Sequence, residues 1–131
     1  MKVIGINGSA RKDGNTAIII RTIFEELNKN GIDTELIQLA DMDIEPCRAC
    51  FVCKGKGNCV FREDGFVKVF SKMAEADGII LGSPVYSADV SSRMKALLER
   101  GGVVAATNPG ILKHKLGVSV AAVRRAGGMT A

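Results

Sequence analysis

The sequence has few aromatic residues, with five Phe, one Tyr and no Trp among 131 residues. It also lacks a strong excess of charge, because 18 Lys and Arg residues stand against 14 Asp and Glu residues and leave a formal net charge of +4. Nucleic-acid-binding proteins usually concentrate basic residues and add aromatic side chains that stack on bases. The scattered charges and the shortage of aromatic rings therefore predict a protein without a nucleic-acid partner.

Long apolar runs are absent as well. The longest one lies around residues 118–123, whereas a membrane-spanning helix needs about 18 apolar residues. The N-terminal segment MKVIGING is apolar over too short a stretch for a secretory signal peptide. We therefore expect a cytoplasmic protein that does not bind a membrane.

The overall composition is that of a folded protein, with 47% hydrophobic and 24% charged residues. A length of 131 residues suits one domain. Short apolar runs that read as buried strands alternate with segments of helical periodicity, and this alternation is typical of an open, doubly wound parallel α/β sheet. We predict strands at residues 2–7, 34–40, 77–82 and 115–123, helices at 16–30, 64–76 and 90–100, and irregular structure at 101–114.

The pattern ends shortly after a strand, so a last helix and a fifth strand are not evident in the sequence. A strand as apolar as residues 118–123 is a poor edge strand, because an exposed apolar edge can pair with other chains. We therefore expect one domain over residues 1–131 that is C-terminally incomplete, or a further tail or a partner subunit that covers this strand.

The glycine-rich segment GSARKDGNT follows the first predicted strand and leads into the first helix. Backbone N–H groups in such a loop, with the N-terminus of the next helix, can bind an anion. The segment adds four polar side chains suited to phosphate: Ser9, Arg11, Asn15 and Thr16. The lysine of the Walker A motif and the dinucleotide-binding glycine pattern are both missing, which favours a terminal monophosphate. A tight turn with a helix cap and no ligand remains the alternative.

Two segments together resemble the flavodoxin-like NADPH-dependent FMN reductases: GSARKDGNT after the first strand and GSPVYSADVSSRMKALLER after the third. The resemblance covers nearly the whole chain. It implies a sheet of strand order 2-1-3-4 and an FMN phosphate held by Ser9, Arg11, Asn15 and Thr16. It also places the flavin ring along Pro84, Val85, Tyr86 and Ser87, and brings the loop after the fourth strand, with Arg124 and Gly127, close to the flavin. The adjacent arginines of that loop could instead meet the NADPH phosphate or a negatively charged partner.

All four cysteines, Cys47, Cys50, Cys53 and Cys59, lie in one short segment with the spacing C-x2-C-x2-C-x5-C. Four thiolates are the usual ligands of a [4Fe–4S] cluster, and basic residues at 48, 54, 56 and 62 would offset its negative charge. Zinc, a disulfide, or free redox-active thiols would also be compatible with these cysteines. The motif resembles the compact cysteine motif of the iron–sulfur flavoproteins, a branch of the same flavodoxin-like group.

The predicted function is an FMN-dependent oxidoreductase that moves electrons between a reduced donor, a [4Fe–4S] cluster and FMN to a small acceptor. The resemblance implies ferredoxin or NAD(P)H as donor and a homodimer or homotetramer. No side chain is assigned as a catalytic acid or base, because the cofactor carries out the chemistry. Three alternatives stay open: an NAD(P)H-dependent FMN or quinone reductase without a cluster, a flavodoxin-type electron carrier that is not an enzyme, and a zinc-stabilised binding module.

Overall fold

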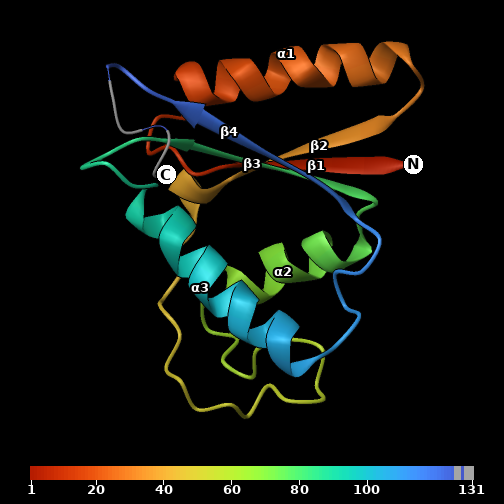
Figure 1. Cartoon of the computed structure of the whole chain (residues 1–131), viewed down its shortest axis with the longest axis vertical. Coiled ribbons are helices and arrows are strands. Elements are labelled where there is room, and N and C mark those ends of the chain that lie inside the picture. The colour runs from red at the N-terminus through yellow and green to blue at the C-terminus, as the bar shows by residue number, and fades with distance from the viewer. Residues whose placement is uncertain (126–127, 129–131) are drawn as a thin grey trace.

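The computed structural model describes residues 1–125 and 128. These residues form a parallel four-stranded sheet of order β2-β1-β3-β4 with three α-helices (Figure 1). In chain order the elements are β1 (Lys2–Asn7), α1 (Asn15–Lys29), β2 (Asp33–Gln38), a 3-10 helix (Leu39–Asp41), α2 (Phe66–Glu75), β3 (Gly78–Pro84), α3 (Ser92–Thr107) and β4 (Leu116–Ala122). The predicted doubly wound sheet and its strand order are confirmed.

Helix α1 covers one face of the sheet, and α2 and α3 cover the other (Figure 1). Side chains alternate along β1, so Val3 joins the core under α1, whereas Ile4 and Ile6 join the larger core under α2 and α3. Gly5 and Gly82 let α1 approach the sheet closely. A Cβ atom at Gly5 would lie 2.5 Å from Cγ2 of Ile20, and one at Gly82 would lie 2.7 Å from Cδ1 of the same residue.

Helix α3 is longer than the sequence pattern predicts. The pair Gly101-Gly102 indicated the end of the helix, but the helix continues to Thr107, and the prediction of irregular structure at residues 101–114 is wrong for its first half. Gly101 is buried against Phe70, where a Cβ atom would lie 3.5 Å from two ring carbons. Val104 is buried one turn further along the same side of the helix, so these residues form a buried stripe. Burial of this stripe outweighs the low helix propensity of two glycines.

Strand β4 lies at the edge of the sheet and pairs only with β3 among the described residues. Leu116 is 71% exposed and Val118 is 54% exposed. That a further strand or a partner subunit covers this edge stays a prediction. No helix in residues 1–125 has both the length and the hydropathy required to cross a membrane.

Candidate functional site

The loop after β1 is held in place by buried polar contacts. The Gly8 amide donates to the carbonyl oxygen of Gly82 at 2.7 Å, and the Ser9 amide donates to Oδ1 of Asn7 at 3.1 Å. Asn7 is fully buried and donates from Nδ2 to Oε1 of Gln38 at 2.7 Å. The side-chain amide of Gln38 donates in turn to the carbonyl oxygen of Lys12 at 3.0 Å. The ends of three neighbouring strands therefore shape one loop.

The phosphate-binding residues predicted from the sequence all lie on this loop or on the first turn of α1. Ser9 and Thr16 are buried, whereas Arg11 and Asn15 are exposed. The Ser9 Oγ accepts the Arg11 amide at 3.0 Å, which leaves the Ser9 hydroxyl hydrogen available to an anion. Gly14 precedes the helix without a capping side chain, and the first turn of α1 carries no acidic residue. The first amides and the positive end of the helix dipole therefore face the loop, and the one carboxylate of the loop, Asp13, is paired with Arg21.

The loop after β3 is a tight turn. The Tyr86 amide donates to the Asp89 carbonyl oxygen at 2.9 Å, and the Asp89 amide donates back at 3.1 Å. Ser87 and Ala88 lie between them with φ angles of 50° and 61°, the left-handed region that two-residue turns of type I′ require. Pro84 is buried, and Tyr86 at the turn is 51% exposed. The turn thus presents the single tyrosine of the sequence at the carboxyl edge of the sheet.

Asp89 ends this turn and starts the approach to α3. Its carboxylate accepts the Val90 amide at 2.7 Å and the Lys95 ammonium group at 3.1 Å. These two hydrogen bonds, the one from the amide first, lower the pKa of Asp89 below its usual value. Asp89 is therefore an ionised anchor of the turn.

Ser91 connects the two loops. Its hydroxyl donates to the carbonyl oxygen of Gly8 at 2.6 Å and accepts the Met94 amide at 3.3 Å as the N-cap of α3. Its own amide donates to Oγ of Ser83 at 2.9 Å. A Cβ atom at Gly8 would lie 3.0 Å from Cβ of Met94, so α3 begins in direct contact with the first loop.

The loops after β1, β3 and β4 lie at the same end of the sheet, because all the strands are parallel (Figure 1). Pro84, Val85, Tyr86 and Ser87 occupy the second of these loops. Arg124 is exposed two residues beyond β4. Gly127, also predicted to approach the flavin, lies outside the described residues. The structure thus brings together the described members of the predicted flavin site, and their contact with a flavin stays a prediction.

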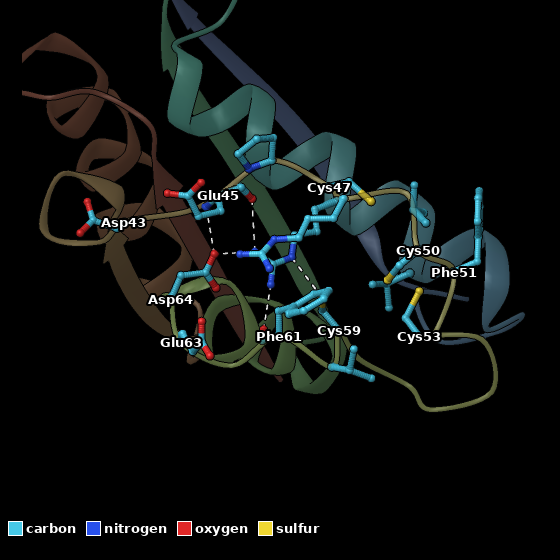
Figure 2. A pocket seen from close by; sticks show the side chains of 16 residues that line it. Asp43, Glu45, Cys47, Cys50, Phe51, Cys53, Cys59, Phe61, Glu63 and Asp64 are labelled. Atoms are coloured by element: carbon cyan, nitrogen blue, oxygen red, sulfur yellow. Dashed lines mark hydrogen bonds and ion pairs between the residues drawn. The ribbon is translucent and has the colours of Figure 1, made fainter.

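The cysteine-rich loop lies on the far side of α2 and α3 from the sheet (Figure 1). It surrounds a pocket of about 260 Å³ that all four cysteines line, together with aromatic, acidic and basic residues. Figure 2 shows Cys47, Cys50 and Cys53 on one side of this pocket and Asp64 on the other. Ala49 and Phe51 adopt left-handed φ angles of 50° and 55°, so the chain turns sharply on both sides of Cys50.

The four thiols are all free, but their surroundings differ. Cys53 and Cys59 are buried, Cys47 is half-buried and Cys50 is exposed. The Cys53 sulfur lies 3.4 Å from Oγ1 of Thr107. Within residues 1–125, no three cysteine, histidine or acidic side chains converge as ligands of a single ion. The loop therefore supplies a suitable set of donors around one pocket, without the geometry of a formed metal centre.

The C-terminal end of α3 holds the middle of this loop. Asn108 donates from Nδ2 to the carbonyl oxygen of Cys53 at 3.0 Å and accepts the Gly57 amide on Oδ1 at 2.8 Å. The Gly55 amide reaches the carbonyl oxygen of Thr107 at 3.4 Å. These contacts do not follow from the sequence pattern, which predicts irregular structure and no helix at residues 101–114.

Arg100 holds both ends of the loop. Arg100 is only 3% exposed, whereas Lys95 and Glu99 of the same helix are exposed. Its spacing from Leu97 and Val104 puts it on the buried stripe of α3, a signal that the sequence did contain. Its guanidinium group lies 4.3 Å above the ring of Phe66.

The guanidinium group of Arg100 has four acceptors. Nε donates to the Cys59 sulfur at 3.3 Å. One terminal nitrogen donates to the Glu45 carbonyl oxygen at 3.2 Å and to the Asp64 carboxylate at 2.5 Å. The other terminal nitrogen donates to the Phe61 carbonyl oxygen at 2.8 Å. Burial lowers the pKa of Arg100, but the hydrogen bonds to Cys59 and Asp64 outweigh burial and raise that pKa above its usual value. Arg100 therefore stays charged.

Asp64 completes this network. Burial raises the pKa of its carboxyl group, but hydrogen bonds from the Glu45 amide, Arg100 and the Phe66 amide outweigh burial and hold that pKa below its usual value. The carboxylate accepts the Glu45 amide at 2.9 Å and the Phe66 amide at 3.2 Å. A charged carboxylate and a charged guanidinium group thus neutralise each other beside the cysteine pocket.

The whole chain, residues 1–131, matches the family described as NADPH-dependent FMN reductase. It is 48% identical over 100 residues to an iron-sulfur flavoprotein of Methanocaldococcus jannaschii, an alignment that covers 76% of this chain and 51% of the relative. It is 35% identical over 120 residues to an iron-sulfur flavoprotein of Methanosarcina thermophila, covering 92% of this chain and 62% of the relative. The chain spans about half the length of the curated relatives it matches.

Solved structures support the fold. RosB with a bound 8-demethyl-8-formylriboflavin-5′-phosphate intermediate superimposes with a TM-score of 0.79 at 22% identity, over 98% of this chain and 54% of that chain. An archaeal flavodoxin superimposes with a TM-score of 0.61 at 18% identity, over 97% of this chain and 66% of that chain. The fold is therefore flavodoxin-like. The chain is similar to relatives named iron-sulfur flavoproteins, and it belongs to the NADPH-dependent FMN reductase family.

Proposed function

We propose that this chain is the cofactor-binding part of an FMN-dependent oxidoreductase that moves electrons between a reduced donor, a [4Fe–4S] cluster and FMN to a small acceptor. The observation that carries the proposal is the joint attachment of two loops to α3. Ser91 at the N-terminus of the helix contacts the loop after β1, and Arg100 and Asn108 contact the cysteine loop. When bound, FMN and the cluster supply two-electron and one-electron redox chemistry.

The loop after β1 fits the phosphate of FMN. The uncapped amides at the start of α1 and the buried hydroxyls of Ser9 and Thr16 provide donors at a positive helix end. Arg11 and Asn15 lie at the surface of the loop, where they can close over a phosphate. In this proposal Tyr86 and its neighbours in the second loop orient the flavin ring, and Arg124 approaches its edge.

The cysteine loop fits a cluster in donor type and in space. Four thiols line one pocket, and two of them, Cys53 and Cys59, are already held by side chains of α3. Arg48 stacks on Phe61, with 4.4 Å between its guanidinium carbon and the ring centroid, and adds positive charge to the pocket wall. Binding would draw the exposed Cys50 and the half-buried Cys47 toward the two buried thiols.

The first test is the composition of protein purified without oxygen from cells supplied with iron. We expect bound FMN together with iron and acid-labile sulfide in equal amounts, at four of each per chain for a [4Fe–4S] cluster. Protein that remains colourless after incubation with FMN would contradict the flavin assignment. Zinc in place of iron would favour a zinc-stabilised loop.

Arg11→Ala tests the phosphate site. We expect it to weaken FMN binding by about 1.5–3 kcal/mol, the range for a hydrogen bond to a charged group. Lys29→Ala, at the end of α1 that lies away from the loop, is the matched control, because it removes the same charge from an exposed position. Equal FMN affinities in the two variants would remove Arg11 from the site.

Cys53→Ser tests the cluster ligands. We expect this variant to take up no stable cluster while FMN remains bound, because the two loops occupy opposite ends of α3. Full iron content in this variant would contradict the assignment of Cys53 as a ligand.

A second candidate function is electron transfer without a substrate, which the likeness of the fold to an archaeal flavodoxin favours. A reductase turns over NAD(P)H or reduced ferredoxin with a small acceptor, whereas a carrier only exchanges electrons with partner proteins. Steady-state turnover with NAD(P)H would exclude the carrier.

Analytical ultracentrifugation would test the homodimer or homotetramer that we propose.

A further inference from the structure

Arg100 is a charged residue in a position where charge is costly. It is 3% exposed, and an arginine buried to this degree destabilises a fold unless its charge and donors are paired. An apolar side chain would fill the same space on the buried stripe of α3 without that cost. The acceptors of Arg100 therefore indicate what the charge contributes.

These acceptors come from both ends of the cysteine loop. The Glu45 carbonyl oxygen precedes the first cysteine of the motif by two residues, and the Phe61 carbonyl oxygen follows the last cysteine by two residues. Asp64, the ion-pair partner of Arg100, holds the Glu45 amide at the same time. A single planar guanidinium group therefore closes the base of the loop, which a lysine ammonium group cannot do with the same geometry.

The remaining contact is to a thiol. Nε of Arg100 donates to the Cys59 sulfur at 3.3 Å, and Cys59 is 8% exposed. Hydrogen bonds to the sulfur ligands of a cluster, and the positive charge beside them, favour the more negative oxidation state and raise the reduction potential. Cys53 has a different neighbour, the uncharged Thr107 hydroxyl.

We propose that Arg100 is the positioning residue of the cysteine loop: it closes the base of the loop, fixes the sulfur of Cys59, and donates an N–H···S hydrogen bond that stabilises the reduced state of the bound cluster. The part of this inference that concerns the reduced state rests on the proposed function. The part that concerns the loop does not, because the contacts that close the loop join groups of the chain itself.

Hydrogen exchange on the cluster-free protein tests the loop. In Arg100→Met we expect the Glu45 amide to exchange roughly tenfold faster or more, because the Asp64 carboxylate that accepts it loses its partner. The Gly57 amide, held by Asn108, should keep its wild-type rate. In Asn108→Ala the Gly57 amide should exchange faster, and the Glu45 amide should keep its wild-type rate. Identical exchange at Glu45 in Arg100→Met and in the wild type would overturn the positioning role.

Potentiometry on protein reconstituted with ferrous iron and sulfide tests the hydrogen bond. Among molecules with full iron content, we expect Arg100→Met to weaken the reduced state roughly tenfold relative to the oxidised state, which shifts a one-electron potential by about −59 mV. Lys68→Met is the control, because it removes an exposed positive charge from α2 outside the cysteine pocket. A potential unchanged from the wild type in these Arg100→Met molecules would overturn the inference, whatever fraction of the preparation they make up.

Arg100→Lys keeps the result interpretable if Arg100→Met takes up little iron. Lysine retains the charge but cannot reach all four acceptors, so we expect a cluster with a potential between those of the wild type and the methionine variant. A wild-type potential in Arg100→Lys would show that an ammonium group serves as well as the guanidinium group and would overturn the specific role of the Arg100 Nε–H···S bond. Wild-type protein that takes up no iron would instead refute the proposed function, and the exchange experiment would still decide the role of Arg100 in the loop.

Discussion

Removal of the Ser91 hydroxyl is expected to damage the loop after β1 from a distance. Ser91 is 7% exposed, caps the first turn of α3 through the Met94 amide, and donates to the Gly8 carbonyl oxygen at 2.6 Å. In Ser91→Ala the helix loses its side-chain cap, and the buried Gly8 carbonyl group loses its donor. Water can replace that donor only by entering a buried position.

The magnitude follows from these two losses. Replacing a serine N-cap by alanine costs about 1 kcal/mol, and an unsatisfied buried carbonyl group costs about 1–3 kcal/mol. Because the two effects share one hydroxyl and are not fully additive, we expect a loss of about 2–3 kcal/mol in the free energy of unfolding. At about 3–4 °C per kcal/mol for a chain of this size, the Tm falls by about 6–12 °C.

Urea unfolding and a thermal scan of the FMN-free protein measure this loss directly. Ser92→Ala is the matched control, because Ser92 is the exposed first residue of the helix and no hydrogen bond from its side chain is found in the described structure. We expect the control to stay within about 0.5 kcal/mol of the wild type. A Ser91→Ala variant as stable as Ser92→Ala would refute the reasoning, because the two contacts would then contribute nothing.

Three further variants test packing and charge. Gly82→Ala should destabilise the fold by about 1–3 kcal/mol in urea unfolding, because the new Cβ would lie 2.7 Å from Cδ1 of Ile20. An unchanged free energy of unfolding would mean that α1 can shift away from the sheet without cost. Gly102→Ala should stabilise the protein by about 0.5–1 kcal/mol, since this helical glycine is exposed and has open space around it. Hydrogen bonds from Lys2 and Lys72 hold the pKa of Glu35 below its usual value. The contribution of Glu35 to the stability of the fold is therefore present above about pH 4 and is lost as the pH falls through that lowered pKa. Glu35→Gln should therefore lose less stability than the wild type between pH 6 and pH 3, and parallel curves would contradict this.

The strand and helix pattern could be predicted because each element keeps one period over most of its length. The buried run at β1 and the stop of α1 at Gly31, with a φ angle of 72°, follow from local rules. The extension of α3 could not be predicted in this way. Two consecutive glycines are a poor local signal for a helix, and only the tertiary contact of Gly101 with Phe70 explains why the helix continues.

The functional site, like the fold, has features that the sequence predicts and features that it does not. The residue types that suit a phosphate or a cluster are visible in the sequence, and the structure groups their described members in two loops. The residues that hold those loops were missed, because Asn7, Ser91, Arg100 and Asn108 act through partners 31 to 83 positions away in the chain. Contacts at such separations follow from the topology of the sheet. The spacing of Arg100 from Leu97 and Val104 indicates that Arg100 is buried, but no local pattern indicates its partners.

Helix α3 sets the distance and the relative rotation between the residues that hold the two loops. Ser91 and Arg100 are nine positions apart, which corresponds to about 13.5 Å along a helix axis. One extra residue inserted between them would rotate the guanidinium group by about 100° and turn it away from the thiol, while the serine stayed in place. Insertions and deletions in this stretch of the helix should therefore be far more damaging than changes of equal size at residues 109–115, the part of the next loop that follows Asn108.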